Sequence, residues 1–415
     1  MKKKWWILGS IFIVVLLVIT TFHFYQPFDI TKTPFDVAYA DEYTMVRRVI
    51  PGGPASCLRC DGDYVIGVGQ VSLLDDDCAL YLYDTNGTLT NLEDDTYSII
   101  ATSDTGQFHQ AQIEGDYITY LDDSVWYGCC PLILKSYQIS TQITRTISTD
   151  VADFMYDRDG DKLVFSILNE NTGPDIALYK FSTQNTTMIC SAIGSQKNPC
   201  VKNNIVTWGE DLRNEQTTGN DVYLYNLTTQ TETAISTAIG NQMACMTDGQ
   251  NYLTYCEEYQ TTKKVLLYNI TTTVTTEINS VTGDNIFIDG GAVIGQNVTY
   301  VETETENGIA VNGVKLYLYN IPTTSKTLIA ESANLHGNGG NDWVSYAGLY
   351  NNYIVYGGWP GVKVYNITTE ITTTIRSTGE TRGIIFNKND NTVLINSKGS
   401  GQDPNEWDIT LVQLP

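Results

Sequence analysis

The stretch Asp221-Val222-Tyr223-Leu224-Tyr225-Asn226-Leu227-Thr228-Thr229 decides how this chain is organised. It joins a short apolar strand to a polar turn, and a second short strand follows. Related phrases recur at steps of 42 to 54 residues. Their aligned positions are Tyr83, Tyr137, Tyr179, Tyr225, Tyr268, Tyr319, Tyr365 and Val412. A repeat of this length predicts units that stack on copies of themselves.

Two further strands precede each phrase and are joined by tight turns such as Asp159-Gly160 and Asp248-Gly249. Glycine supplies the positive φ that such hairpin turns need. Each unit therefore contains four strands, which we call a, b, c and d in chain order. The c strands are apolar at successive positions, as expected for a sheet that is buried on both faces. Period and strand number together predict an all-β fold, a β-propeller of four-stranded antiparallel blades.

The number of a–b turns predicts eight blades, and seven blades are the alternative. The predicted turns lie near Asp61-Gly62, Glu114-Gly115, Asp159-Gly160, Asn203-Asn204, Asp248-Gly249, Gly290-Gly291, Asn351-Asn352 and Asn389-Asp390. The last unit ends with its c strand, residues 407–414, and has no d strand. Residues 43–50 form a strand-like run that belongs to no complete unit. We expect this run to pair with the final c strand and to close the ring without an open sheet edge.

The segment Asn204-Ile205-Val206-Thr207-Trp208, with the phrase that begins at Asp221, resembles the repeats of TolB-like propellers. The resemblance extends over residues 43–415 and is nearest to versions in prokaryotic, especially archaeal, cell-surface proteins. This chain differs from TolB in its eight predicted units, where TolB has six, and in lacking TolB's separate N-terminal domain. The resemblance implies the fold but no particular activity, because such propellers serve many roles.

The N-terminal region predicts a membrane anchor. Residues 1–4 form a basic cytoplasmic tail, residues 5–22 a transmembrane helix, residues 23–42 a linker and residues 43–415 the propeller. An apolar run of this length can cross a hydrocarbon core of about 30 Å, and the lysines should stay in the cytoplasm. A cleaved signal peptide is the alternative, although Ala38-Tyr39-Ala40 lies far beyond the apolar run for a cleavage site. Either way, we expect the propeller to be extracellular.

Export agrees with two further patterns. Candidate N-glycosylation sites are Asn86, Asn185, Asn226, Asn269, Asn297 and Asn366. Most of them fall on c–d turns, and Asn297 falls near an a–b turn. Disulfide candidates are Cys57, Cys60, Cys78, Cys129, Cys130, Cys190, Cys200, Cys245 and Cys256. An oxidising compartment favours a structural role for these cysteines over metal binding.

Charge and motifs argue against several function classes. The chain carries 47 acidic and 24 basic residues, a net charge of -23, which excludes nucleic acid as an expected partner. It has 3 histidines and no recognisable catalytic motif, so we expect neither an enzyme nor a metal centre. The run Asp157-Arg158-Asp159-Gly160-Asp161 imitates a calcium loop but lacks the bidentate acid, because Leu168 occupies that position.

The b–c loops are the predicted binding face, opposite the a–b and c–d turns. Candidate binding residues there are Asp75, Asp76, Asp77, Asp122, Asp123, Trp126, Glu210, Asp211, Glu257, Glu258, Trp359 and Trp407. Such an acidic, aromatic rim could bind a protein or a glycan at the cell surface, and Ca²⁺ is a conceivable cofactor. The sequence predicts a binding, adhesion or envelope-scaffold module. An extracellular carbohydrate- or peptide-processing enzyme with channel carboxylates and a self-assembling array or filament subunit are the alternatives.

The predicted closing strand also implies an orientation. A d strand starts at the c–d turns, so a chain that enters the ring at residue 43 enters from the turn side. We therefore expect the b–c loops to point away from the membrane.

Overall fold

The computed structural model describes residues 37–40, 43–49, 56–70, 78–88, 93–104, 107–123, 131–213, 217–283, 286–306, 309–331, 345–358, 361–376, 380–386, 392–398 and 408–414. Contacts divide the chain into Met1–Asp36 and the compact unit Val37–Pro415. The predicted tail and anchor lie outside the described residues. Within the described ranges, no helix has the length and apolar character that crossing a membrane requires.

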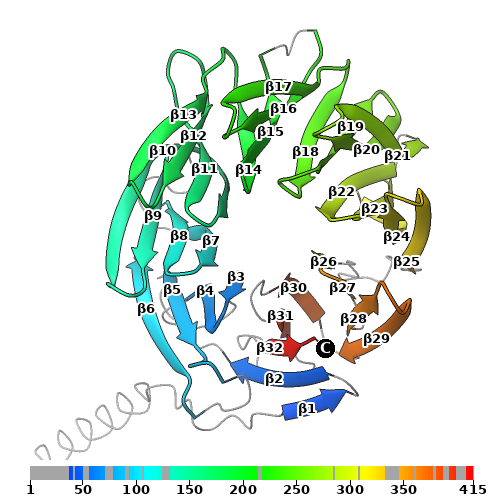
Figure 1. Cartoon of the computed structure of the whole chain (residues 1–415). Helices are drawn as coiled ribbons and strands as arrows, with labels where there is room; N and C mark the ends of the chain where they lie inside the picture. Colours follow the sequence, from blue (N-terminus) through cyan, green and yellow to red (C-terminus); the bar gives the residue numbers. More distant parts are fainter. Residues whose placement is uncertain are drawn as a thin grey trace, which may run out of the picture. The chain divides into compact units, whose positions relative to one another are not determined.

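Every regular element of the described residues is a β-strand (Figure 1). The a strands are β3 (Ser56–Asp61), β7 (Phe108–Glu114), the second half of β10 (Ile143–Asp159), β14 (Lys197–Lys202), β18 (Asn241–Thr247), β22 (Ile286–Ile294), β26 (Ser345–Tyr350) and β30 (Glu380–Phe386). The b strands are β4 (Tyr64–Gln70), β8 (Tyr117–Asp122), β11 (Lys162–Ile167), β15 (Ile205–Asp211), β19 (Tyr252–Tyr259), β23 (Asn297–Glu306), β27 (Tyr353–Gly358) and β31 (Thr392–Lys398).

The c strands carry the repeated phrase. They are β5 (Cys78–Asp84), β9 (Leu132–Gln138), β12 (Asp175–Lys180), β16 (Asp221–Asn226), β20 (Thr262–Asn269), β24 (Ile309–Asn320), β28 (Gly361–Asn366) and β32 (Asp408–Gln413). The d strands are β6 (Thr96–Ser103), the first half of β10, β13 (Asn185–Cys190), β17 (Thr231–Ser236), β21 (Val274–Thr282), β25 (Ser325–Glu331), β29 (Ile371–Arg376) and β2 (Tyr43–Val49). One additional strand, β1 (Val37–Ala40), precedes them.

Most sheets are four-stranded and antiparallel in the order a, b, c, d, but two depart from this plan. The strands β7 to β13 form one seven-stranded sheet, because β10 continues from the d position of one unit into the a position of the next. The last sheet has the order β1-β2-β32-β31-β30 and therefore five strands. Successive a strands contact each other along the chain, and β3 also contacts β30.

The hydrophobic core lies between successive sheets. One cluster joins Ile66 and Leu80 of the first sheet to Ile118 of the next. Another joins Ile176 of β12 to Trp208 of β15, and both side chains are completely buried. Burying one large apolar side chain stabilises a fold by roughly 1.5–3 kcal/mol, so each sheet depends on its neighbours for most of its core. This packing explains why the c strands are apolar at successive positions.

The a–b and c–d turns lie at the same edge of each sheet. In seven units of the described chain, a backbone carbonyl of the a–b turn accepts an N–H from the c–d turn at 2.7–3.0 Å. The donor and acceptor pairs are Thr85–Asp63, Ile139–Asp116, Phe181–Asp161, Leu227–Asn204, Ile270–Asn251, Ile321–Gln296 and Ile367–Asn352. We call this edge the turn face, and the opposite edge, where b strands end and c strands begin, the b–c loop face.

One predicted turn is wrong. Gly290 and Gly291 lie inside β22, where the pairing with β23 is irregular between Gly290 and Val293. The hairpin turn is at Gly295, whose φ of +59° suits the position. A glycine pair fits an irregular strand as well as a turn, so glycine alone did not locate the hairpin.

The N-terminal strand β2 pairs antiparallel with β32, the final c strand, from Thr44–Gln413 to Val49–Asp408. This is the strand pairing that the sequence predicted. Gln413 in turn pairs with Thr392, the first residue of the b strand β31, so residue 44 lies at the turn face.

The strand β1 was not predicted and reverses the direction of the chain. It pairs antiparallel with β2, from Val37–Val46 to Ala40–Tyr43. The chain therefore runs through β1 toward the turn face before it turns into β2. The start of β2 thus lies at the turn face, as expected, but the chain reaches it by running along β2 as β1 and not directly from that face.

Candidate functional site

The b–c loop face is the candidate site because its loops differ most among the units. Several of its predicted binding residues, Asp75, Asp76, Asp77, Trp126, Trp359 and Trp407, lie outside the described residues. Glu210 belongs to β15, but its side chain is outside the described part. The structure thus tests the predicted acidic rim at Asp122, Asp123, Asp211, Glu257 and Glu258.

Asp122 and Asp123 are internal residues and not exposed rim acids. Asp122 is buried and pairs with the Lys135 Nζ at 2.6 Å, and Asp123 is buried with its carboxylate 2.9 Å from His109 Nε2. Asp123 also accepts the backbone N–H of Gln107. A buried carboxylate requires partners of this kind, since an unpaired one is costly. These two acids stabilise the end of β8, which corrects the expected solvent exposure.

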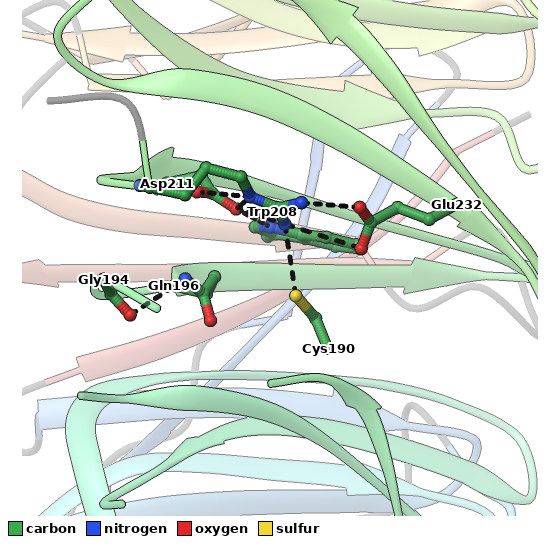
Figure 2. Close-up of polar contacts among 7 residues, drawn as sticks. Cys190, Gly194, Gln196, Trp208, Asp211 and Glu232 are labelled. Carbon is green, nitrogen blue, oxygen red and sulfur yellow. Dashed lines mark hydrogen bonds and ion pairs between the residues drawn. The ribbon is translucent and has the colours of Figure 1, made fainter. Parts of the chain in front are cut away.

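Asp211 is likewise buried, and its carboxylate organises the b–c loop after β15 (Figure 2). Its Oδ2 accepts a hydrogen bond from Trp208 Nε1 at 3.0 Å. Arg213 donates from Nε to Oδ1 at 2.9 Å and from Nη2 to Oδ2 at 2.7 Å. The backbone N–H of Arg213 also donates to Oδ1 at 3.0 Å. Asp211 therefore accepts four donors within the six-residue segment Trp208–Arg213 and is not available to a ligand.

Arg213 extends this arrangement to neighbouring strands (Figure 2). Its Nη1 lies 2.7 Å from Glu232 Oε1 on β17, and its guanidinium lies 3.9 Å from the centre of the Tyr223 ring. Burial alone would lower the pKa of Arg213, but hydrogen bonds to Asp211 and Glu232 and the charge of Asp211 raise it. The residue is a permanent cation that ties the b–c loop to the c and d strands.

Cys190 belongs to the end of β13 and meets the same cluster across the boundary between two sheets. Arg213 Nη2 lies 3.2 Å from its sulfur (Figure 2). Burial raises the pKa of the Cys190 thiol to about 11, despite the adjacent guanidinium. A thiol with so high a pKa is a poor nucleophile at neutral pH. Its contribution here is packing between sheets.

Gly194 lies in the connection between β13 and β14 and packs closely against the b–c loop that follows β15. Its φ is +106°, and a Cβ at this position would lie 2.8 Å from the backbone carbon of Leu212. Leu212 N–H donates to the carbonyl of Ser195 at 2.9 Å. Figure 2 shows the bond from Gln196 Nε2 to the carbonyl of Gly194, at 2.9 Å. The loop after β15 is thus fixed by the connection that leads into β14.

Glu257 and Glu258 lie within β19 and not in a loop. They face Lys264 and Lys263 across the pairing with β20, and each carboxylate oxygen lies 3.4 Å from the opposing Nζ. Cross-strand pairs of opposite charge stabilise a sheet modestly. These acids have a structural explanation that does not require a ligand.

An open groove of about 460 Å³ lies on the b–c loop face of the unit formed by β11, β12 and β13. It is lined by Leu168, Asn169, Glu170 and Asn171 of the b–c loop and by Met188 and Ser191 at the end of β13. Leu168 is 40% exposed and Met188 48% exposed. The sequence gives no reason to select Glu170, because Met188, on the apolar side of the groove, comes from a strand 18 residues further along the chain.

The predicted glycosylation sites share the turn face. Asn226, Asn269 and Asn366 each accept two backbone N–H groups of their own turn through Oδ1. Asn320, which Pro322 prevents from being a glycosylation signal, accepts the Thr323 N–H at 3.2 Å in the same way. Turn geometry therefore explains these asparagines whether or not they carry glycans.

The remaining sites occupy the same edge in other ways. Asn86 is exposed in the first c–d turn, and Asn185 is exposed at the start of β13. Asn297 accepts a hydrogen bond from Asn320 Nδ2 at 3.2 Å. The Thr299 of its signal is completely buried.

Five disulfide candidates, Cys60, Cys78, Cys190, Cys200 and Cys256, are present as thiols. The side chains of Cys57, Cys129, Cys130 and Cys245 lie outside the described residues. The predicted bridges stay a prediction. Most of the five described thiols are buried, and a buried thiol packs as a small apolar side chain.

Each residue of the calcium-like run has a structural partner. Asp157 accepts the Val201 N–H, Asp159 pairs with Lys202 at 2.6 Å and Asp161 accepts the N–H and hydroxyl of Ser182. Arg158 is buried 4.5 Å from the centre of the Phe181 ring. Among the described side chains, no group of three or more His, Cys, Asp or Glu residues is arranged to hold a metal ion.

Comparisons with known proteins support the fold. Neither a family model nor a curated protein matches this chain. The Dos1 propeller is similar over 88% of this chain and 94% of its own, with 10% identity and a TM-score of 0.55. Oligogalacturonate lyase from Vibrio parahaemolyticus is similar over 92% and 96%, with 12% identity and a TM-score of 0.50.

TolB from Acinetobacter baumannii is also among the similar structures, at 11% identity over 72% of this chain and 78% of that chain, with a TM-score of 0.37. The predicted all-β propeller fold is confirmed. Identities this low concern the fold alone.

Proposed function

We propose that this protein is a membrane-anchored, extracellular β-propeller that binds a protein or a glycan through its b–c loop face. The observation that carries the proposal is the contrast between the two edges of the sheets. The turn face repeats one hydrogen-bond pattern, whereas the b–c loop face carries irregular loops and the groove at Leu168 and Met188. Variable loops on a rigid repeated frame are where binding residues concentrate.

We further propose eight blades, with the ring closed by β2. The contact between β3 and β30 and the pairing of β2 with β32 support this arrangement. The continuous strand β10 contributes to two blades. Closure of this kind leaves no broad open edge between the first and last sheets.

We also propose where the protein is located in the cell. The apolar run of residues 5–22 supports a single-pass anchor with an extracellular C-terminal domain. N-glycosylation is proposed because the candidate asparagines all lie at the turn face, where Asn86 and Asn185 are exposed. An archaeal cell surface is proposed because the repeats resemble those of archaeal surface proteins. Bridges among Cys57, Cys129, Cys130 and Cys245 are proposed on the same expectation of an oxidising compartment.

Site-specific photo-cross-linking in the cells that make the protein tests this function. A photo-reactive residue at Glu170 places the probe on the b–c loop face, and one at Thr272, which is exposed in a c–d turn, places it on the turn face. We expect a discrete cross-linked partner from position 170 and none from position 272. The reverse result would contradict the proposed binding face.

A further inference from the structure

We infer that the groove beside β13 binds the cationic side chain, Arg or Lys, of an exposed segment of a partner protein. The inference rests on the proposed function, since it names the partner chemistry for one part of the b–c loop face. It depends on the apolar wall of the groove, on the carboxylate at its rim and on the charge of the whole chain.

The apolar wall suits the aliphatic part of a long basic side chain. Leu168 is 40% exposed on the loop and Met188 48% exposed on β13, and both line the groove. Ile193, two residues beyond the groove-lining Ser191, is 80% exposed. Arg and Lys cover apolar surface with their methylene groups while the charged end remains hydrated. A volume of about 460 Å³ lies within the usual range of ligand sites.

Two carboxylates line the groove, and they differ in what they already bind. Asp175 is completely buried and accepts hydrogen bonds from Asn169 Nδ2 at 2.6 Å and from Thr172 Oγ1 at 2.9 Å. These bonds fix the loop. Glu170 is exposed and, among the residues that the structure describes, makes no ion pair or hydrogen bond through its carboxylate. Glu170 is therefore the acid that remains for a cation.

The loop that presents Glu170 is held in place before any ligand arrives. Leu168 N–H donates to the carbonyl of Asp150 at 2.7 Å, and Gly173 N–H donates to the carbonyl of Asn169 at 2.9 Å. Asn171 N–H donates to Asn169 Oδ1 at 3.1 Å. A preorganised loop loses little conformational entropy on binding.

Charge complementarity selects a cation over an anion or a neutral group. The protein has a net charge of -23. A second exposed acid, Asp150, lies beside the groove, since its backbone carbonyl accepts the N–H of Leu168. The charge field of such a protein attracts basic segments and repels acidic ones. The planar guanidinium of Arg can engage the Glu170 carboxylate through two N–H groups at once.

Binding of short labelled peptides to the full-length protein in detergent tests the inference. The peptides have the sequence acetyl-Gly-Ser-Gly-X-Gly-Ser-Gly-amide, where X is Arg, Lys, citrulline or Glu. We expect Arg and Lys peptides to bind more tightly than the citrulline peptide, which has the same shape as Arg but no charge. Their affinity should fall with added salt.

Glu170→Gln should weaken Arg-peptide binding about threefold, because an ion pair at an exposed carboxylate is screened by solvent. Leu168→Ser should weaken it by removing part of the apolar wall. Glu370→Gln is the matched control, since Glu370 is exposed in a c–d turn at φ +58° and Gln142, Gln184 and Gln230 also adopt positive φ in such turns. It should leave binding unchanged, and all three variants should keep the wild-type melting temperature.

Equal binding of the citrulline and Arg peptides, or equal effects of Glu170→Gln and Glu370→Gln, would overturn the inference. If spermidine competes as strongly as the Arg peptide, the groove binds a free amine and not a segment of a partner protein, and the inference is wrong. A cross-linked partner at position 170 together with no cation preference would sink the inference but leave the proposed function standing. A partner cross-linked only at position 272 would remove the proposed function itself.

Discussion

The two edges of the sheets differ in how their polar groups are used. On the turn face, one backbone hydrogen bond between the a–b and c–d turns recurs in seven units of the described chain. On the b–c loop face, the loops after β8, β11 and β15 are fixed by three different sets of side chains, centred on Asp123, Asp175 and Asp211. The acidic residues of these loops therefore serve first to stabilise the loops themselves. We expect a binding role only for acids that do not stabilise their own loop, such as Glu170.

The largest effect should follow removal of the Asp211 carboxylate. Asp211→Ala leaves the Arg213 guanidinium and the Trp208 N–H without their shared acceptor in a buried position. We expect the free energy of unfolding to fall by about 3 kcal/mol, as for other broken buried ion pairs. Urea denaturation measures it. A loss no greater than that of Glu370→Gln, for which we expect less than about 0.5 kcal/mol, would show that this loop is not held by Asp211.

A smaller, pH-dependent loss of stability is expected when Asp159 is changed, because Asp159 pairs with Lys202 of the next unit at the turn face. Burial favours the neutral form of Asp159, but the Lys202 ammonium and the Asn203 N–H together lower its pKa. Its stabilising contribution is therefore complete above the unfolded pKa of about 3.9 and is lost as pH falls through the lower folded value. Because Lys202 is partly exposed, solvent screening limits the expected cost of Asp159→Asn at pH 7 to about 1 kcal/mol.

Thermal denaturation of wild type and Asp159→Asn across pH 2 to 7 checks this. The difference in melting temperature between wild type and Asp159→Asn should become smaller as the pH falls below about 4. A gap that stays constant over this range would mean that the charge of Asp159 does not contribute.

Asn226 in a c–d turn has two possible roles that can be separated: it accepts backbone N–H groups of the turn, and it begins a glycosylation signal. Asn226→Ala removes the acceptor of the Thr228 and Thr229 N–H groups and should cost about 1 kcal/mol. Asn226→Asp retains an acceptor oxygen but destroys the glycosylation signal, so it should be nearly neutral in protein made without glycans. Equal losses in both variants, measured by urea denaturation, would contradict the capping role.

The smallest effect on stability should come from the proposed ligand-binding acid. Glu170→Gln should change the free energy of unfolding by less than about 0.5 kcal/mol, because the exposed carboxylate supports no part of the loop. Its melting temperature should match that of the wild type. A clear destabilisation would place Glu170 with Asp175 and Asp211, as another acid that stabilises its own loop.

Much of the fold could be predicted because its signals are local and repeated. The Tyr-rich c strands and turns such as Asp159-Gly160 fix strand and hairpin positions within a few residues of chain. Gly290-Gly291 shows where this reasoning fails, since an irregular strand also favours glycine. The strand β1 escaped prediction because four residues carry too little pattern to identify a strand.

The candidate site could be predicted only as a face. Counting acids after the b strands found Asp122, Asp123 and Asp211, but it did not find their partners. Lys135 and His109 come from neighbouring strands, and Arg213 comes from the same loop as Asp211, two residues further along. Sequence cannot show which of several neighbouring carboxylates has a partner. The groove has the same origin, since Leu168 and Met188 meet only after β12 and β13 have paired.

The repeat, the four-strand unit and the placement of both turn types on one edge follow from sequence alone, because strand alternation and turn chemistry act over a few residues. Tertiary structure decided the continuous strand β10, the reversal at β1 and the division of the acids into structural and available ones. The environment of a carboxylate is set by groups about 3 Å away. Only the folded backbone decides whether those groups come from the same loop, as around Asp211, or from another strand, as around Asp122.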